Sequence, residues 1–276
     1  MGVPSAEASE AVLVGAGDIA ECNSSGDAAT AALINSIGGK VFTLGDNAYE
    51  SGTDKEYKKC YGQTWGKFKS RTRPAIGNHE YHAKDARGYF DYFRGAAGAR
   101  GKGWYSYSAG AWRVIVLNSN CHKVGCGKGS QQERWLRAEL ARHDNKCTLA
   151  YFHHTRFSSD KHHGNSPEVG AFWDALYDYG AELVLSGHAH SYERFAPQTP
   201  WGKADPSHGI RQIVVGTGGS SHYRLGSPRA NSQVRNASTF GVLKLELQSN
   251  GYEWKFIPVA GKSFTDSGKG SCHGRP

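Results

Sequence analysis

Short apolar segments recur along this chain, and five of them end directly on side chains that can bind a metal ion or a phosphate. The carboxyl ends of parallel strands meet at one edge of an open α/β sheet, and ligands bind there. The sequence therefore predicts strands with a shared polar edge. The residues at this edge and the segments before them are Asp18 after 12–14, Asp46 and Tyr49 after 41–44, Asn78 and His79 after 74–76, His153 after 149–152, and His188 and His190 after 183–185.

Helical patterns alternate with these segments over the first two thirds of the chain, which favours an α/β fold. Asp27 is expected to cap the first helix, and Gly38 and Gly39 to end it. The helices are predicted at 27–37, 131–143 and 168–179.

The last third of the chain, from Ser191, has the pattern of strands and turns. Upstream of it, residues 104–117 are typical of a β-hairpin. We expect an α/β sandwich whose C-terminal part supplies a more antiparallel sheet. No linker, repeat or low-complexity tract divides the sequence, so we expect a flexible segment 1–10 and a single domain over residues 11–276.

The first segment also matches a nucleotide-binding fingerprint. Gly15, Gly17 and Ala20 satisfy the G-x-G-x-x-G/A pattern, and Asp46 lies loosely where a ribose-binding carboxylate would follow. That turn must open directly into a helix whose N-terminus holds the pyrophosphate. Residues 21–26 instead form a turn-rich stretch. We therefore interpret the glycines as a turn that presents Asp18, with a nicotinamide-dependent dehydrogenase as an outside alternative.

Composition and charge exclude several classes of partner. The 276 residues carry a formal net charge of +8, yet no run of Lys and Arg is longer than two, so a dedicated nucleic-acid surface is not predicted. No apolar stretch approaches the roughly 18 residues that a membrane-spanning helix needs. A basic surface also suits small phosphorylated substrates. We expect no membrane span, and we favour a monomer.

The six cysteines indicate an oxidising compartment. Their number is even and none forms a C-x-x-C pair, so disulfides explain them better than a zinc or thioredoxin site. The pairing stays open, although the short loop from Cys121 to Cys126 is the safest pair. The first ten residues contain no apolar stretch of a signal peptide. We therefore expect the mature form of a secreted or extracytoplasmic protein.

The ligand types at the polar edge select a kind of metal centre. Carboxylates, imidazoles and an amide oxygen, with no thiolate, suit iron, zinc or manganese. Two ions about 3.5–4 Å apart need a bridging group, which a carboxylate can supply. Such a pair clamps a phosphoryl group and generates hydroxide near neutral pH. The expected chemistry is in-line hydrolysis of a phosphate ester.

Taken together, the five segments resemble the signature of the metallophosphoesterases, and specifically of the purple acid phosphatases. That signature is GDxG, GDxxY, GNH(D/E), VxxH and GHxH. Three blocks match in full, while Ala20 and Ala150 replace a glycine and a valine without removing a ligand. The resemblance implies a four-layer αββα sandwich, with two mixed sheets face to face. The blocks are GDIA at 17–20, GDNAY at 45–49, GNHE at 77–80, AYFH at 150–153 and GHAH at 187–190.

Carried over by position, the resemblance implies two metal sites that share Asp46. Iron(III) is implied at one site, and a divalent zinc, iron or manganese ion at the other. A phenol, with an ordinary pKa of about 10, binds well only to a hard and strongly acidic ion, so Tyr49 favours iron(III). The first ligand set is Asp18, Asp46, Tyr49 and His190, and the second is Asp46, Asn78, His153 and His188.

The resemblance also implies which residues handle the substrate. His79 is expected to contact the phosphate and the leaving group. His162 and His163 are expected to bind phosphate or to protonate the leaving alkoxide, which a histidine does well at mildly acidic pH. The alternative for this pair is an exposed place in a Lys- and Gly-containing loop.

Other residues near the motifs receive weaker assignments. His222 and Tyr223 are candidates for lining a substrate pocket. The glycine-rich stretch 216–219 before them is either a tight turn or a place where the backbone approaches the site. Glu80 is expected to orient an imidazole rather than to bind metal, and His154 receives no role.

The sequence favours a binuclear-metal phosphatase that hydrolyses phosphate monoesters by attack of a metal-bound hydroxide. The same site would also suit phosphodiesters or phosphotriesters. An iron pair would alternatively turn over peroxide, and a non-catalytic metal-binding protein is a further alternative.

Overall fold

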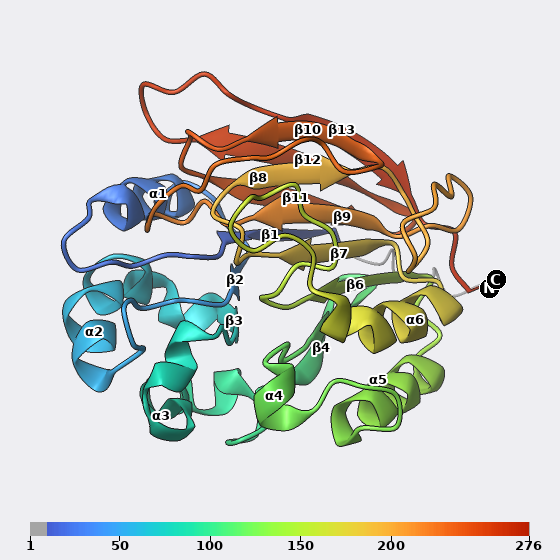
Figure 1. Ribbon diagram of the computed structural model, residues 1–276, viewed down its shortest axis with the longest axis horizontal. Coiled ribbons are helices and arrows are strands. Elements are labelled where there is room, and N and C mark those ends of the chain that lie inside the picture. Colours follow the sequence, from blue (N-terminus) through green and yellow to red (C-terminus); the bar gives the residue numbers. More distant parts are fainter. Residues whose placement is uncertain (1–9, 276) are drawn as a thin grey trace, which may run out of the picture.

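The computed structural model describes residues 10–275, and in it two β-sheets pack face to face with helices on both outer sides (Figure 1). The αββα sandwich expected from the sequence is confirmed. The expected flexible segment 1–10 lies outside the described residues, apart from residue 10. Within the described residues, no helix has the length and hydropathy to cross a bilayer.

The elements follow the expected alternation closely. The strands are β1 (Ala11–Ala16), β2 (Lys40–Leu44), β3 (Thr72–Ala75), β4 (Tyr105–Ala109), β5 (Trp112–Val116), β6 (Cys147–Tyr151), β7 (Leu183–Ser186), β8 (Tyr192–Phe195), β9 (Arg211–Val215), β10 (Ser232–Asn236), β11 (Gly241–Gln248), β12 (Gly251–Pro258) and β13 (Ser267–Ser271). The α-helices are α1 (Gly26–Asn35), α2 (Asp54–Lys59), α3 (Arg87–Phe93), α4 (Cys121–Val124), α5 (Gln131–Arg142) and α6 (Gly170–Asp178).

Each sheet contains a run of parallel strands. In the six-stranded sheet, ordered β13-β12-β11-β1-β2-β3, the strands β1, β2 and β3 are parallel. In the seven-stranded sheet, ordered β10-β8-β9-β7-β6-β5-β4, the strands β5, β6, β7 and β9 are parallel. The polar residues predicted from the sequence follow the carboxyl ends of β1, β2, β3, β6 and β7.

Strand β6 shows why these segments are apolar without interruption. Leu149 and Tyr151 point into the core between the two sheets. Ala150 and Phe152 point the other way, into a core shared with Leu136 of α5 and the side chains of α6. A strand that is buried on both faces needs apolar residues on both, so its sequence does not alternate.

The C-terminal strands differ from the expectation, because they extend both sheets instead of building one of their own. Strand β11 pairs antiparallel with β1, with Leu245 opposite Leu13, and β12 and β13 continue that sheet. Strands β8, β9 and β10 join the other sheet. Leu13 of β1 and Leu243, Leu245 and Leu247 of β11 lie in the same buried core, so the pairing of these two strands adds apolar surface to it.

The start of the first helix was also predicted wrongly. Helix α1 begins at Gly26 after Ser25, and Asp27 lies within its first turn without capping it. The carboxylate of Asp27 instead accepts a hydrogen bond of 2.7 Å from the Thr64 hydroxyl. Gly26 is required there, because a Cβ at this position would lie 2.3 Å from the carbonyl oxygen of Gly219. Tertiary contacts therefore set the helix start.

All six cysteines form disulfides, and the predicted pair Cys121–Cys126 is among them. Cys147 at the start of β6 is joined to Cys272 near the end of the chain, 125 residues away. The third bridge, Cys22–Cys60, ties the loop after β1 to the end of α2. The bridges hold loops and the C-terminal tail against the sheets.

We expect the Cys147–Cys272 bridge to stabilise the fold more than the Cys121–Cys126 bridge. Cross-linking over 125 residues removes more chain entropy from the unfolded state than cross-linking over 5. Loss of the long bridge should lower the free energy of unfolding by about 5 kcal/mol, against about 2 kcal/mol for the short one. Chemical denaturation of the double variants C147A/C272A and C121A/C126A measures both. Equal losses would contradict this account.

Candidate metal centre

Seven predicted ligand side chains from five separate loops converge on one place between the two sheets. Three loops follow strands of the six-stranded sheet, and two follow strands of the seven-stranded sheet. The contributions are Asp18 after β1, Asp46 and Tyr49 after β2, Asn78 after β3, His153 after β6, and His188 and His190 after β7.

The Tyr49 hydroxyl lies at the centre of the first group. It is 3.0 Å from a carboxylate oxygen of Asp18, 3.2 Å from Oδ2 of Asp46 and 3.0 Å from Nε2 of His190. All four side chains are buried. Four potential ligand atoms therefore face one another without solvent.

His153 lies at the centre of the second group. Its Nε2 is 3.1 Å from Oδ2 of Asp46, 2.9 Å from the side-chain oxygen of Asn78 and 3.2 Å from Nδ1 of His188. The ligand atoms of Asp46, His153 and His188 all lie within 4.8 Å of one another. The atoms suit a divalent ion with nitrogen and oxygen ligands.

Asp46 joins the two groups. Its Oδ2 contacts both the Tyr49 hydroxyl and Nε2 of His153, while its other oxygen accepts the backbone N–H of His79 at 2.9 Å. A single buried carboxylate is thus common to both donor sets. This is the arrangement that a pair of adjacent metal ions requires.

The remaining ring nitrogens of two histidines are held by hydrogen bonds. Nδ1 of His153 lies 2.8 Å from the carbonyl oxygen of Leu44, which accepts its proton and leaves Nε2 free for a metal ion. Nδ1 of His190 lies 2.7 Å from the hydroxyl of Ser221. Partners of this kind fix the orientation and the tautomer of ligand imidazoles.

The backbone around the ligands is under strain. Asp18, Asp46 and His188 adopt φ values of 60°, 48° and 67°, in the left-handed region that side-chain-bearing residues rarely occupy. Such residues cluster at functional sites, where the surrounding structure holds them in place.

The motif glycines leave room for the ligands. A Cβ at Gly77 would lie 2.1 Å from Oδ1 of Asp46, and one at Gly187 would lie 2.6 Å from Oδ2 of Asp18. These two glycines are therefore each required by a carboxylate that comes from another motif.

Charges within the cluster shift its pKa values strongly. Burial raises the pKa of Tyr49 well above 10, and the carboxylates of Asp18 and Asp46 raise it further. Burial opposes ionisation of Asp46, but His153 and other histidines outweigh it and hold the pKa of that carboxyl well below its usual range. Burial lowers the pKa of His153, but Asp46 outweighs this effect and raises it to about 9. The carboxylate of Asp46 therefore favours positive charge beside it, as a metal site requires.

Glu80 is a buried carboxylate that shapes the loops instead of pointing into the cluster. One of its oxygens accepts the backbone N–H groups of Asp46 and Gly77, at 3.1 and 2.7 Å. The other accepts the N–H of Asn47 at 2.7 Å and the hydroxyl of Tyr57 at 3.0 Å. Glu80 therefore positions the Asp46 loop rather than an imidazole, which corrects the expected mode of action.

The predicted substrate histidines surround the cluster. The His79 ring is 4.5 Å from the Tyr49 ring, and its Nδ1 lies 2.7 Å from the carbonyl oxygen of Glu50. The His163 ring lies 3.8 Å from the His188 ring, with His162 beside it. Burial and His162 lower the pKa of His163 to about 4. A bound phosphate would raise that value, because a nearby negative charge favours the imidazolium.

The structure also shows what orients the His162–His163 pair. A carboxylate oxygen of Asp160 accepts the backbone N–H groups of both histidines, at 2.8 and 2.7 Å. Sequence reasoning missed Asp160. An aspartate whose side chain bonds to the backbone two and three residues later is typical of a turn, and that signal was present in the sequence.

Both weaker candidates contact His190, Tyr223 at the ring and His222 at the backbone, where its Nδ1 lies 3.3 Å from the carbonyl oxygen. Tyr223 stacks on the His190 ring at 4.1 Å with an interplanar angle of 15°. His222 instead stacks on Phe240 at 4.2 Å. The glycine-rich stretch approaches the site, because a Cβ at Gly216 would lie 2.9 Å from Oδ2 of Asp18.

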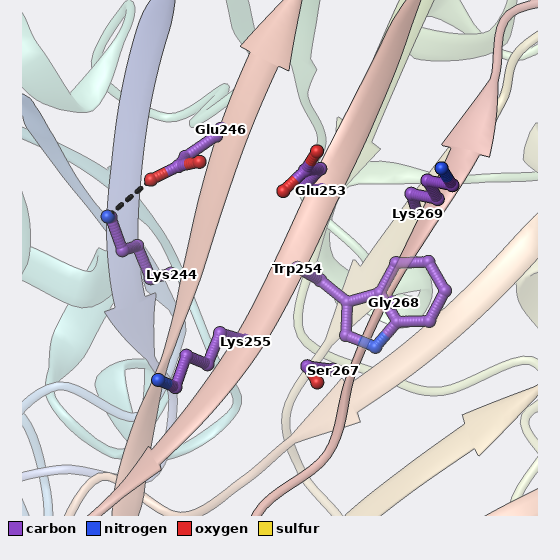
Figure 2. Close-up of a pocket in the computed structure, with 8 residues that line it drawn as sticks. All are labelled: Lys244, Glu246, Glu253, Trp254, Lys255, Ser267, Gly268 and Lys269. Atoms are coloured by element: carbon purple, nitrogen blue, oxygen red, sulfur yellow. Dashed lines mark hydrogen bonds and ion pairs between the residues drawn. The ribbon is translucent and has the colours of Figure 1, made fainter.

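A separate cavity of about 420 Å³ lies along strands β11, β12 and β13 (Figure 2). Its charged residues carry both signs, and Lys244 and Glu246 pair with each other. It shares no residue with the ligand cluster, and none of its lining residues is a histidine or a cysteine. The predicted chemistry therefore belongs to the cluster at the strand ends.

We expect E80Q to weaken metal binding about ten- to a hundredfold and to cost about 1–3 kcal/mol of stability. Both oxygens of Glu80 accept backbone N–H groups. In the glutamine variant, either orientation of the side-chain amide therefore places its NH₂ group against a backbone N–H donor. Metal titration and thermal unfolding measure the two effects. The exposed Glu253 provides the control variant E253Q. Unchanged metal affinity in E80Q would contradict the positioning role.

Comparison with known protein families gives a match over the part of the chain that holds the site. The family model described as calcineurin-like phosphoesterase matches residues 13–192. A protein of Mycobacterium tuberculosis without an assigned function is 30% identical over 185 residues, which cover 54% of this chain and 35% of that protein.

Two plant relatives have assigned names. Purple acid phosphatase 15 of Arabidopsis thaliana is 28% identical, over 56% of this chain and 32% of its own length. Phosphoenolpyruvate phosphatase of Allium cepa is 27% identical, over 82% of this chain and 55% of its own length. The chain therefore spans between about a third and about half of the length of these curated relatives.

Solved structures share the fold at low sequence identity. A purple acid phosphatase from yellow lupin seeds superposes with a TM-score of 0.77 at 18% identity, covering 95% of this chain and 54% of its own. The anchor protein of the Plasmodium inner membrane complex gives 0.70 at 14% identity, with 93% and 88% coverage. A fold shared with a phosphatase and an anchor does not assign an activity. The plant relatives nevertheless confirm the resemblance to purple acid phosphatases, and the matched family model shows that the chain belongs to the calcineurin-like phosphoesterase family.

Proposed function

We propose that this protein is a two-metal phosphatase that hydrolyses small phosphate monoesters. The observation that carries the proposal is the position of Asp46, whose Oδ2 lies 3.2 Å from the Tyr49 hydroxyl and 3.1 Å from Nε2 of His153. A carboxylate common to two donor sets suits two adjacent ions, and two adjacent ions suit phosphoryl transfer. The family match supports a binuclear centre.

The donor sets fit different ions. One set is Asp18, Asp46, Tyr49 and His190, and we propose that it holds iron(III). The pKa of Tyr49 is raised by burial and by two carboxylates, so only an ion of high charge would stabilise its phenolate. The other set is Asp46, Asn78, His153 and His188, which suits divalent zinc, iron or manganese.

When bound, the two ions would supply Lewis acidity and lower the pKa of water at the site. The protein's own groups would then bind and orient the ester. Nδ1 of His79 donates to the carbonyl oxygen of Glu50, which leaves Nε2 to contact the substrate. Asp160 holds the loop that carries His162 and His163, and we propose that this pair binds phosphate and returns a proton to the leaving oxygen.

We further propose an extracytoplasmic location and a single catalytic domain over residues 11–276. The three disulfides support the location, because such bonds persist in oxidising compartments. We assign Tyr223, stacked on His190, to the wall of the substrate pocket. His222 is a weaker candidate for that wall, because its ring packs against Phe240.

The activity is tested with nitrophenyl phosphate monoesters and diesters on metal-loaded protein. We expect the monoester to be the better substrate and D46N to reduce its hydrolysis to near background, because the variant loses the carboxylate shared by both donor sets. E253Q serves as the matched control. Faster hydrolysis of the diester would show that the substrates are phosphodiesters instead of monoesters. Peroxide turnover that exceeds ester hydrolysis would show a redox activity instead. Full activity in D46N would contradict the site.

The iron assignment is tested by visible spectroscopy of protein purified without chelator. We expect a broad absorption band from phenolate-to-iron charge transfer that Y49F removes. Tyr223 supplies the control, because its ring stacks on His190 while the Tyr49 hydroxyl faces the ligand atoms. Y223F should keep the band. If the protein is colourless, free of iron and still active, the iron(III) assignment is wrong and both sites hold divalent ions.

A further inference from the structure

His154 follows a predicted ligand directly, and the structure gives it an unusually well-defined position. The hydroxyl of Ser119 lies 2.9 Å from the backbone nitrogen of His154 and 2.9 Å from its Nδ1. Ser119 itself is buried between two buried asparagines. Asn118 binds the Tyr81 hydroxyl, and Asn120 binds the carbonyl oxygen of Gly77. The serine is therefore held rigidly in the loop after β5.

The two contacts of Ser119 determine where the imidazole proton of His154 lies. A backbone N–H can only donate, so the Ser119 oxygen accepts from His154 N. The Ser119 oxygen could accept a second hydrogen bond, but its buried hydroxyl proton has no acceptor other than Nδ1 among the described residues. Donation to Nδ1 satisfies that proton and makes Nδ1 an acceptor. A neutral imidazole whose Nδ1 accepts carries its proton on Nε2. Ser119 thus presents His154 as a donor through Nε2.

This donor lies beside the metal ligands without being one of them. The His154 ring is 4.5 Å from the His188 ring and 5.1 Å from the His153 ring. The compact group of ligand atoms formed by Asp46, His153 and His188 does not include it. Nε2 has no hydrogen-bond partner among the described residues, and it is not one of their fully buried polar atoms without partners. It is therefore accessible to solvent and free to meet a hydrogen-bond acceptor.

We propose that His154, positioned by Ser119, is a substrate-contact residue whose Nε2–H donates a hydrogen bond to a terminal oxygen of the bound phosphoryl group. The inference rests on the proposed function for its substrate class. The terminal oxygens of a phosphate monoester dianion, the main form above its second pKa of about 6, only accept hydrogen bonds, so a nitrogen fixed as a donor complements them. The contact lies on the side of the site formed by His153 and His188.

The proton position is tested first, in the protein without added metal. Nitrogen-15 NMR of histidine-labelled protein should show His154 protonated at Nε2 and unprotonated at Nδ1. In S119A the fixed tautomer should be lost. A proton on Nδ1 in the unmodified protein would overturn the inference.

The contact itself is tested by binding of inorganic phosphate to metal-loaded protein, measured by calorimetry. H154A should weaken phosphate binding about ten- to a hundredfold, since it removes a hydrogen bond to a charged group. H154Q keeps a donor at a similar reach and should retain most of the affinity. H208A provides the control, because His208 is exposed and lies before the amino end of β9, away from the site.

Measurements of metal content and of steady-state kinetics on H154A distinguish a substrate contact from a role in holding the metal site together. In H154A we expect unchanged metal content and a KM that rises about as much as the phosphate dissociation constant, with a smaller change in kcat. Wild-type phosphate affinity in H154A, or a loss that follows loss of metal, would overturn the inference. If the wild type binds phosphate through His154 yet hydrolyses no ester, the proposed function fails and this contact stands. If the wild type binds no phosphate, both fail.

Discussion

Burial of the Asp46 carboxylate between two sets of donor atoms is the constraint on which the rest of the site depends. A buried negative charge is costly unless positive charge and hydrogen bonds compensate for it. His153 is suited to this role, because Asp46 raises the pKa of that histidine to about 9. Two metal ions would meet the same requirement with more charge. The strained backbone at Asp18 and His188 and the motif glycines then follow from the need to bring ligands around one carboxylate.

The sequence predicts most of this site because each ligand follows a strand whose sequence is easily recognised. Strands that are buried on both faces, such as β6, have uninterrupted apolar sequences and end on polar residues. The parallel order of the strands then brings Asp18 and Asn78 to one edge of the six-stranded sheet and His153 to an edge of the seven-stranded sheet, and the packing of the two sheets joins these edges. The five-motif resemblance adds the division into two ligand sets. The same resemblance implies the αββα architecture, whereas the alternation of helices and strands alone favours an α/β sandwich.

Features set by tertiary contacts could not be predicted in this way. The start of α1 depends on Thr64 and on the approach of Gly26 to Gly219, which no local pattern shows. The division of the C-terminal strands between two sheets depends on which strand edges remain free. Ser119 and His154 meet only in the folded chain, so a serine after β5 carries no signal in the sequence. The place of His222 likewise depends on tertiary contacts, with the Phe240 ring and with the backbone carbonyl of His190.

The central claim is that two ions share Asp46, and anomalous diffraction from crystals of the metal-loaded protein tests it most directly. The account predicts two anomalous peaks about 3.5–4 Å apart, one on each side of the Asp46 carboxylate. One peak should lie among Asp18, Tyr49 and His190, and the other among Asn78, His153 and His188. A single peak in fully loaded crystals, or peaks that do not contact Asp46, would contradict the account.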